Sequence, residues 1–331
     1  MTLGAILLAG NVGAWLWALA AFGSHPVLIG AALLAYVLGL RHAVDADHIA
    51  AIDNVTRNLM QQGRKPLAVG LYFSLGHSTI VILACAAIAG MSVTLRSRFS
   101  QLSDLGGVAG PTVSVGFLLL IAAANVGTLV AICRAFRVQR SEAAPRLEDP
   151  VFPGGVLVRL LRPLLRLISK PWHMYPLGFL FGLGFDTATE VGLLAIAARQ
   201  ASHVPLWSIM TFPALFTAGM ALIDTADAAL MARAYGWAFV KPRRKLAYNL
   251  VMTLVSIVVA VIVASLEALN LAAGKFAMNG GFWRWISNLN DHFGAIGALM
   301  VLFFVGCWGI SLLICSTPKL REPVVEVGQS R

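Results

Sequence analysis

Histidines and aspartates alternate within a short segment that lies between two apolar stretches of the chain. Residues 41–49 have the sequence RHAVDADHI, which contains His42, Asp45, Asp47 and His48. Neutral imidazoles and ionised carboxylates together are ligands that suit borderline divalent transition metals. We therefore expect this segment to bind a divalent metal ion, with His42 and His48 as its strongest candidate ligands.

Three later segments also carry polar groups inside apolar stretches. They are FSLGHSTIV at 73–81, LGFDTATE at 183–190 and GMALIDTAD at 219–227. Their candidate ligands are His77, Asp186, Glu190, Asp224 and Asp227. A charged side chain at the centre of a membrane-spanning helix costs about 2.5–3.5 kcal/mol, so it needs a compensating group. Because Arg41 is the one clear cation in these stretches, the excess of carboxylates predicts that protons or a bound cation balance the charge.

The spacing of the first segment limits how its side chains can meet. His42, Asp45 and His48 form one stripe of a straight helix, at about 100° per residue. Asp47 lies on roughly the opposite side of such a helix. It can join the two histidines around one ion only if the helix is kinked or unwound, which Gly39 just upstream would permit. The alternative is that Asp47 orients an imidazole through a hydrogen bond.

Simpler structural roles are open for several of these residues. His77 could be a hydrogen-bonded packing residue, and the later carboxylates could be proton relays or contacts between helices. Arg41 could pair with Asp45, four positions away, as a structural counter-ion, or it could act as a gate. Met220 is expected to pack rather than to bind a metal beside carboxylates. Asp53 lies near the end of its apolar stretch, where we expect a solvated or helix-capping side chain.

The elements that must position these residues are membrane-spanning helices. Of the 331 residues, 58% are hydrophobic and only 12% are charged, whereas about a quarter of a soluble protein is charged. A helix needs roughly 20 apolar residues to cross a bilayer. Eight stretches suit this length, at about 3–22, 27–55, 67–91, 112–136, 173–198, 206–231, 246–270 and 293–316. We predict an all-α polytopic membrane protein with about eight transmembrane helices and a single integral-membrane domain over residues 1–331.

The distribution of basic residues predicts the orientation of the chain and its surface partners. Most of the 25 Lys and Arg residues lie in alternate loops, including a loop at 138–171, and in a tail at 317–331. The positive-inside rule places these segments and both termini in the cytoplasm. We expect the spans to lie in the inner (cytoplasmic) membrane. The basic loops also predict contact with anionic lipid. Because the basic residues lie between spans, the net charge of +10 does not indicate nucleic-acid binding.

A weak internal repeat relates the two halves of the chain. The dipeptide GL occurs 34 positions before FSLGH and again 34 positions before FTAGM. The shared offset of 143 positions pairs Asp47 with Glu190 and His77 with Met220. Because the two pairs of spans would have opposite orientations, we hypothesise an inverted repeat of the kind found in secondary transporters.

The four polar segments resemble the signatures of the nickel/cobalt transporter (NiCoT) family. RHAVDADHI contains the H-x4-D-H pattern of that family, and the other three signatures follow in the same order. The resemblance covers residues 1 to about 320 and implies a bacterial or archaeal type of permease for Ni²⁺ and/or Co²⁺, which supplies metal to enzymes such as hydrogenase or urease. The metal site that it implies consists of His42, Asp47 and His48, supported by Asp45, His77, Asp186, Glu190, Asp224 and Asp227.

The predicted function is secondary transport of Ni²⁺ and/or Co²⁺ into the cell, by alternating access through the intramembrane His/Asp site. We expect no enzymatic activity and no cofactor besides the transported ion. The chain has no nucleotide-binding P-loop, and no ATPase subunit is evident in it. Two alternatives are open: a membrane enzyme that uses His42-x4-Asp47 as base and orienting acid, as in glycerolipid acyltransferases, and a non-selective cation or proton channel. An intramembrane metalloprotease is disfavoured because the H-E-x-x-H motif is absent.

Overall fold

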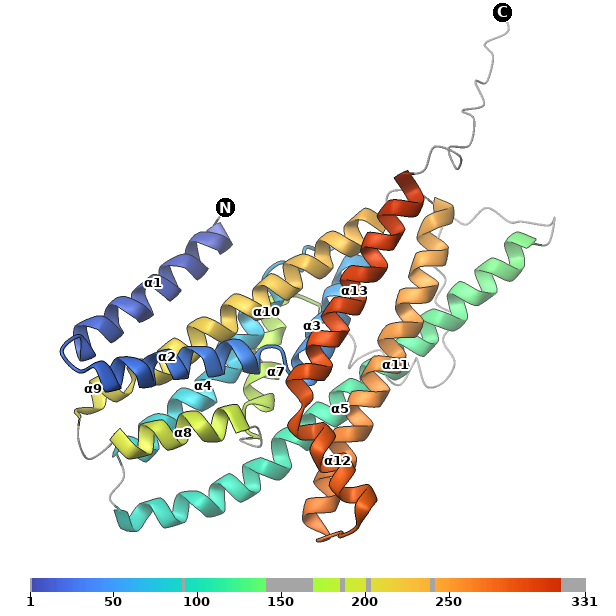
Figure 1. Ribbon diagram of the computed structural model, residues 1–331. Coiled ribbons are helices and arrows are strands. Elements are labelled where there is room, and N and C mark those ends of the chain that lie inside the picture. Colours follow the sequence, from blue (N-terminus) through green and yellow to red (C-terminus); the bar gives the residue numbers. More distant parts are fainter. Residues whose placement is uncertain are drawn as a thin grey trace, which may run out of the picture.

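The computed structural model describes residues 2–90, 93–140, 169–184, 188–200, 204–238 and 242–316, and every regular element in these ranges is a helix (Figure 1). The helices are α1 (Thr2–Phe22), α2 (Pro26–His42), α3 (Ala46–Gln61), α4 (Val69–Gly90), α5 (Val93–Arg140), the 3-10 turn η1 (Pro171–His173), α7 (Met174–Phe181), α8 (Ala188–Gln200), α9 (Leu206–Ile209), α10 (Thr211–Ala238), α11 (Pro242–Lys275), α12 (Gly281–Asp291) and α13 (Phe293–Ser316). The predicted all-α class is confirmed. Asp186, most of the 138–171 loop and the tail at 317–331 lie outside the described residues.

Several of these helices are long and apolar enough to cross a membrane. Five single segments meet this requirement of length and apolar composition: Leu3–Phe22, Val69–Gly90, Gly107–Gly127, Leu206–Ala234 and Thr253–Lys275. The pair α2 and α3 passes as one bent span, which makes six. The two other predicted spans correspond to α7 with α8 and to α13. The chain is therefore a multi-pass membrane protein, while the count of eight and the positions of the termini stay predictions.

The helix α3 has a polar sequence and lies at the centre of the bundle. It packs against α4, α5, α10, α11 and α13, and in Figure 1 it lies between α10 and α13. Its buried polar side chains are His48, Asp53, Asn54, Thr56 and Arg57. Polar side chains are costly against lipid, so a helix of this composition must be surrounded by protein. The central position of α3 explains how the chain accommodates its most polar span.

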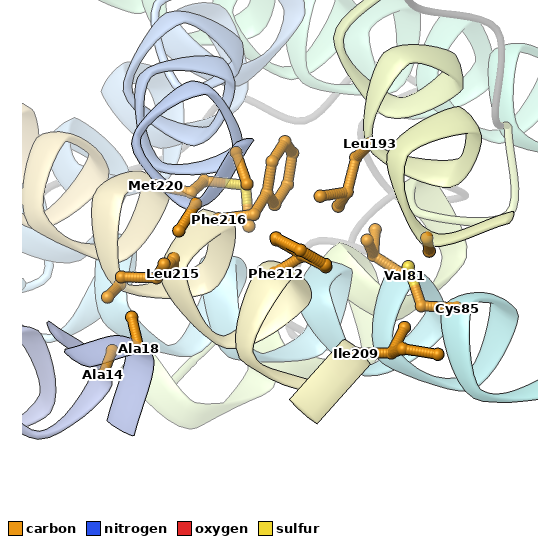
Figure 2. Close-up of a cluster of buried hydrophobic side chains, with 14 of the residues drawn as sticks. Ala14, Ala18, Val81, Cys85, Leu193, Ile209, Phe212, Leu215, Phe216 and Met220 are labelled. Atoms are coloured by element: carbon orange, nitrogen blue, oxygen red, sulfur yellow. The ribbon is translucent and has the colours of Figure 1, made fainter. Parts of the chain in front are cut away.

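A large apolar core fixes the helices that surround the candidate ligands. Figure 2 shows Phe212 and Phe216 of α10 beside Val81 of α4 and Leu193 of α8. Met220 of α10 belongs to the same core and is fully buried, which confirms that it is a packing residue. The core holds α4, α8 and α10 together, and each of these helices carries a candidate ligand.

The second predicted span is broken inside the candidate metal motif. The helix α2 ends at His42, α3 begins at Ala46, and the two are bent by 53°. Asp45 precedes α3 with an extended backbone, at φ −64° and ψ 145°. The helix is therefore interrupted, which was one of the two alternatives that the sequence left open. The break lies after His42 and not at Gly39, which stays within α2.

Glycines allow the backbones of neighbouring helices to touch at positions related by the internal repeat. A Cβ atom at Gly76 of α4 would overlap the carbonyl oxygen of Tyr175 in α7. A Cβ atom at Gly219 of α10 would lie 2.8 Å from the carbonyl oxygen of Tyr36 in α2. Gly76 and Gly219 are separated by the same 143 positions as the repeated sequence segments. Since α4 packs on α7 as α10 packs on α2, these contacts support the repeat hypothesis.

A second pair of glycine contacts joins the same helices. A Cβ atom at Gly39 of α2 would overlap the carbonyl of Phe216, and one at Gly178 of α7 would overlap the carbonyl of Phe73. The two phenylalanines are again 143 positions apart. Small residues that let backbones approach closely are the usual basis of helix packing in membranes. Gly39 therefore serves helix packing rather than the kink that the sequence suggested.

Candidate metal centre

Three imidazoles from three helices meet at the break between α2 and α3. His42 is the last residue of α2, His48 lies in the first turn of α3, and His77 lies within α4. Their ring centroids are 4.6, 4.8 and 5.0 Å apart, and all three side chains are buried. The sequence indicated the first two as a pair, and the structure brings His77 to them.

The ring nitrogens of the three histidines converge on one small space. One ligand atom of each residue lies within 4.8 Å of the others. The Nε2 atoms of His42 and His77 are 3.0 Å apart. Metal–nitrogen bonds of about 2.0–2.1 Å would separate two ligands at a right angle by about 3 Å. The spacing therefore suits two ligands of one ion, and two ring nitrogens so close need a proton or a cation between them.

Carboxylates contact two of the imidazoles, and one of them can orient its ring for metal binding. Nδ1 of His42 lies 3.0 Å from Oδ2 of Asp45 and 3.1 Å from Oγ1 of Thr189. We assign the proton to Nδ1, which donates to Asp45, because a carboxylate accepts hydrogen bonds. Oε1 of Glu190 lies 2.9 Å from Nε2 of His77, the same nitrogen that faces His42, so Glu190 lies on the ligand side of that ring. A proton on Nδ1 of His42 leaves its Nε2 with a lone pair for a metal, as in many carboxylate–histidine–metal arrangements.

Among the three histidines, His48 has the surroundings that most clearly indicate a metal ligand. It is fully buried, yet neither of its ring nitrogens has a hydrogen-bond partner in the described chain. Nδ1 of His48 lies 3.5 Å from Oδ1 of Asp224, whose Oδ2 accepts a 2.6 Å hydrogen bond from Oγ of Ser74. A buried polar group without a partner is costly, by about 1–3 kcal/mol. The structure thus holds an imidazole whose nitrogens are available beside a carboxylate.

Asp47 lies beside the three histidines rather than among them. It is in the first turn of α3, it interacts electrostatically with His48 and His42, and its buried Oδ1 has no hydrogen-bond partner among the described residues. Nδ1 of His42 donates its hydrogen bond to Asp45, whereas the acyltransferase pattern assigns the accepting role to Asp47. The two roles foreseen for Asp47, ligand or orienting group, stay predictions.

The other candidate residues differ in where the structure places them. Glu190 and Asp224 lie at the histidines, whereas Asp227 lies one turn further along α10. The prediction of a solvated or capping Asp53 is wrong: this side chain is 1% exposed and accepts a hydrogen bond from Ser256. The reason is that α3 is surrounded by other helices along its length. Arg41 is exposed, and it forms no ion pair with Asp45 within the described part of the chain.

Three residues that contact the centre were not predicted from the sequence. Ser74 precedes His77 by three positions, which puts both on one face of α4, so the helical spacing offered a signal. The ring centroids of Phe73 and Phe216 lie 4.8 Å from that of His48 and 5.6 Å from that of His42, respectively. Phenylalanines in an apolar chain carry no signal of this kind. They enclose the imidazoles from two sides.

The chain also matches a family of known proteins. The family model described as high-affinity nickel-transport protein matches residues 28–314, a range that includes every residue of the centre. The chain belongs to this family. The histidine centre therefore lies in a member of the high-affinity nickel-transport family.

Relatives of this nickel-transport family member match it over most of its length. A high-affinity nickel transport protein of Cupriavidus necator is 54% identical over 314 residues, 94% of this chain and 90% of that protein. The hydrogenase nickel incorporation protein HupN of Bradyrhizobium diazoefficiens is 49% identical over 93% of this chain and 82% of its own. The cobalt transport protein NhlF of Rhodococcus rhodochrous is 37% identical over 86% of this chain and 82% of its own. No solved structure matches the chain.

Proposed function

We propose that this protein imports Ni²⁺ and/or Co²⁺ across the cytoplasmic membrane as a secondary transporter. The family and the nickel transport proteins among its relatives support nickel, and the related cobalt transport protein supports cobalt. The observation that carries the site assignment is the convergence of His42, His48 and His77. Imidazole is a suitable ligand for both ions.

The ion is held by the three imidazoles while the surrounding carboxylates balance its charge. Asp45 fixes the ring of His42, Glu190 lies beside the ligand nitrogen of His77, and Asp224 lies against His48. Asp47 completes the coordination or orients the ion's ligands. Three neutral nitrogen ligands leave further coordination positions for water or carboxylate oxygen.

Movement of the ion follows the alternating-access scheme. The helix break between α2 and α3 separates His42 from His48, so a change in the angle between these helices alters the geometry of the site. Opening the site in turn to the outside and to the cytoplasm moves the ion across. The inside-negative potential favours import by about 2.3 kcal/mol per charge per 100 mV.

Uptake of ⁶³Ni²⁺ into proteoliposomes that contain the purified protein tests this proposal. We expect His42→Ala and Asp47→Asn to lose uptake, and the His292→Ala variant to retain it because His292 is exposed at the end of α12. Uptake like that of the wild type in both His42→Ala and Asp47→Asn would remove the proposed site. Acyl transfer by the purified protein without cation flux would favour the enzyme instead.

The pH dependence of metal competition provides a second test. Lowering the pH protonates imidazoles, which then repel the cation and cannot coordinate it, so binding weakens as the pH falls. We expect the KM for nickel to rise when the pH is lowered from about 7.5 to about 5.5. Competition by Co²⁺, Zn²⁺ and Mn²⁺ at each pH separates a selective site from a non-selective channel, in which all four ions would pass alike.

A further inference from the structure

A second group of buried polar residues begins about one turn beyond His48 on α3 and beyond Asp224 on α10. It consists of Asp53 and Arg57 of α3, Asp227 of α10, and Thr253 and Ser256 of α11, and is called the carboxylate cluster below. Asp53, Arg57 and Asp227 are 1%, 2% and 5% exposed, and the two hydroxyl residues are fully buried. Nothing in the histidine centre requires these residues, so their burial needs another explanation.

Three helices build the carboxylate cluster. Oγ of Ser256 donates a 3.1 Å hydrogen bond to Oδ2 of Asp53. Nη1 of Arg57 donates a 2.7 Å hydrogen bond to Oγ1 of Thr253. The two α3 residues are four positions apart and the two α11 residues are three apart, so each pair lies on one helix face. The hydrogen bonds thus join one face of α3 to one face of α11.

Asp227 is a buried carboxylate without a compensating partner. Neither of its oxygens has a hydrogen-bond partner in the described chain. It interacts electrostatically with Asp53 and Asp224, which are both acidic and therefore do not neutralise it. Leaving an unpaired carboxylate away from water is costly, so a proton or a bound cation is expected at this position.

Arg57 does not supply that positive charge directly. Its Nε and Nη2 atoms also lack hydrogen-bond partners, although the guanidinium is buried. The ion pairs found among the described residues all join histidines to carboxylates and do not include Arg57 with Asp227. Arg57 therefore does not neutralise Asp227 by direct contact.

The donor atoms of the cluster define the chemistry of a cation that binds there. The carboxylates of Asp53 and Asp227 and the hydroxyl of Ser256 offer only oxygen. Oxygen ligands accept a hydrated divalent cation and favour hard ions such as Mn²⁺, whereas imidazoles favour nickel, cobalt and zinc. The cluster therefore has the donor set of a divalent cation site that differs from the histidine centre.

We propose that Asp53 and Asp227, with Ser256, form a second binding station for a divalent cation. Asp224 connects the two stations, because it lies 3.5 Å from His48 and interacts electrostatically with Asp227. Along the helices, the rise of about 1.5 Å per residue places the second station roughly 5–8 Å from the first. The role of this station in inward release rests on the proposed function, but the existence of the station does not.

Arg57 limits how tightly the second station holds an ion. Its charge, one turn of α3 away from Asp53, offsets one of the two carboxylate charges. Attraction for a divalent ion is weaker than it would be with two uncompensated carboxylates. An ion that leaves the imidazoles therefore meets a site that binds it less strongly and releases it.

Binding stoichiometry in the purified full-length protein tests the two-station proposal. We expect equilibrium dialysis with ⁶³Ni²⁺ to give two bound ions for the wild type, one tighter than the other. Asp53→Asn and Asp227→Asn should each bind one ion, with the nickel–nitrogen signal in X-ray absorption unchanged. His48→Ala should lose the nitrogen-ligated ion and keep the other. The Mn²⁺ concentration that displaces half of the weaker ion should be at least tenfold lower than the concentration that displaces half of the tighter one.

Controls separate the second station from misfolding and from the first station. Asp291→Asn, at the exposed end of α12, should bind two ions like the wild type. If Asp227→Asn does not elute as a folded protein, Ser256→Ala replaces it, with an expected several-fold weaker second ion. A single ion in the wild type, or two ions of unchanged affinity in Asp53→Asn and Asp227→Asn, would overturn the second station. Absence of the nitrogen-ligated ion would instead overturn the proposed function.

Discussion

The two halves of the protein related by the repeat share a packing arrangement but supply different chemistry. Residues 26–90 provide the three imidazoles, whereas residues 174–238 provide Glu190, Asp224 and Asp227. At the repeat offset, His77 of the first half corresponds to Met220 of the second, which packs in the apolar core. The comparison teaches that two halves with the same packing can form an asymmetric site, with all three imidazoles in the first half and carboxylates in both.

Removing a nitrogen ligand from the first half should have the largest effect. We expect His48→Ala to reduce ⁶³Ni²⁺ uptake by more than about 100-fold, because loss of an orienting partner alone costs about 10–100-fold. Initial uptake rates in proteoliposomes measure this, with His292→Ala as the control. A loss smaller than tenfold in a folded variant would show that the unpartnered nitrogens of His48 are not ligands.

Removing a carboxylate that contacts an imidazole should have a smaller and similar effect in either half. Glu190→Gln in the second half and Asp45→Asn in the first each remove a negative charge beside one imidazole. We expect each to lower nickel affinity by about 10–100-fold. Equilibrium dialysis measures both variants. If only Asp45→Asn lowers nickel affinity, Glu190 of the second half does not contribute to nickel binding, which would contradict the comparison.

The repeated glycine contacts can be tested through stability. Gly76→Ala should lower stability by about 1–3 kcal/mol or more, since the new methyl group overlaps a backbone carbonyl. Gly219→Ala should also destabilise, but less, because its closest contact is longer. Gly30→Ala, with nothing within 4 Å, is the matched control. Thermal unfolding in detergent ranks the three, and equal stability of Gly76→Ala and Gly30→Ala would contradict the packing described.

The smallest effect is expected from Ser74→Ala. This change removes the hydrogen bond to Asp224 and leaves the carboxylate against His48 in place. One such bond contributes about 0.5–1.5 kcal/mol, or about two- to tenfold in the KM for nickel. Uptake at varied nickel concentration measures it. A change in maximal rate with no change in KM would show that Ser74 acts on movement rather than on binding.

The sequence was sufficient to predict the features that depend on residue type and local spacing. Long apolar stretches predicted helices, and His42 and His48 with acids between them predicted a polar centre within the membrane. The helical wheel also showed that Asp47 can join the two histidines only if the helix is interrupted, and a break is present at residues 43–45. The cause assigned to it was wrong, because Gly39 packs against α10.

Features that depend on contacts between distant segments were not predictable in this way. The meeting of His77 with His42 depends on how α4 packs against the other helices, which no local pattern specifies. The burial of Asp53 likewise follows from the central position of α3, since the residue lies near the end of an apolar stretch where solvent was expected. The weak repeat was detectable, but its glycine contacts needed the structure to give it physical meaning.

The break between α2 and α3 has a mechanical consequence for the site. His42 and His48 lie on opposite sides of the three-residue break, so the angle between α2 and α3 sets the distance between these two rings. Because α3 also packs into two apolar clusters, any change in this angle must be accompanied by repacking around Ile49 and Ile52. In the proposed transport cycle, such a change would leave the ion with two nitrogen ligands in place of three.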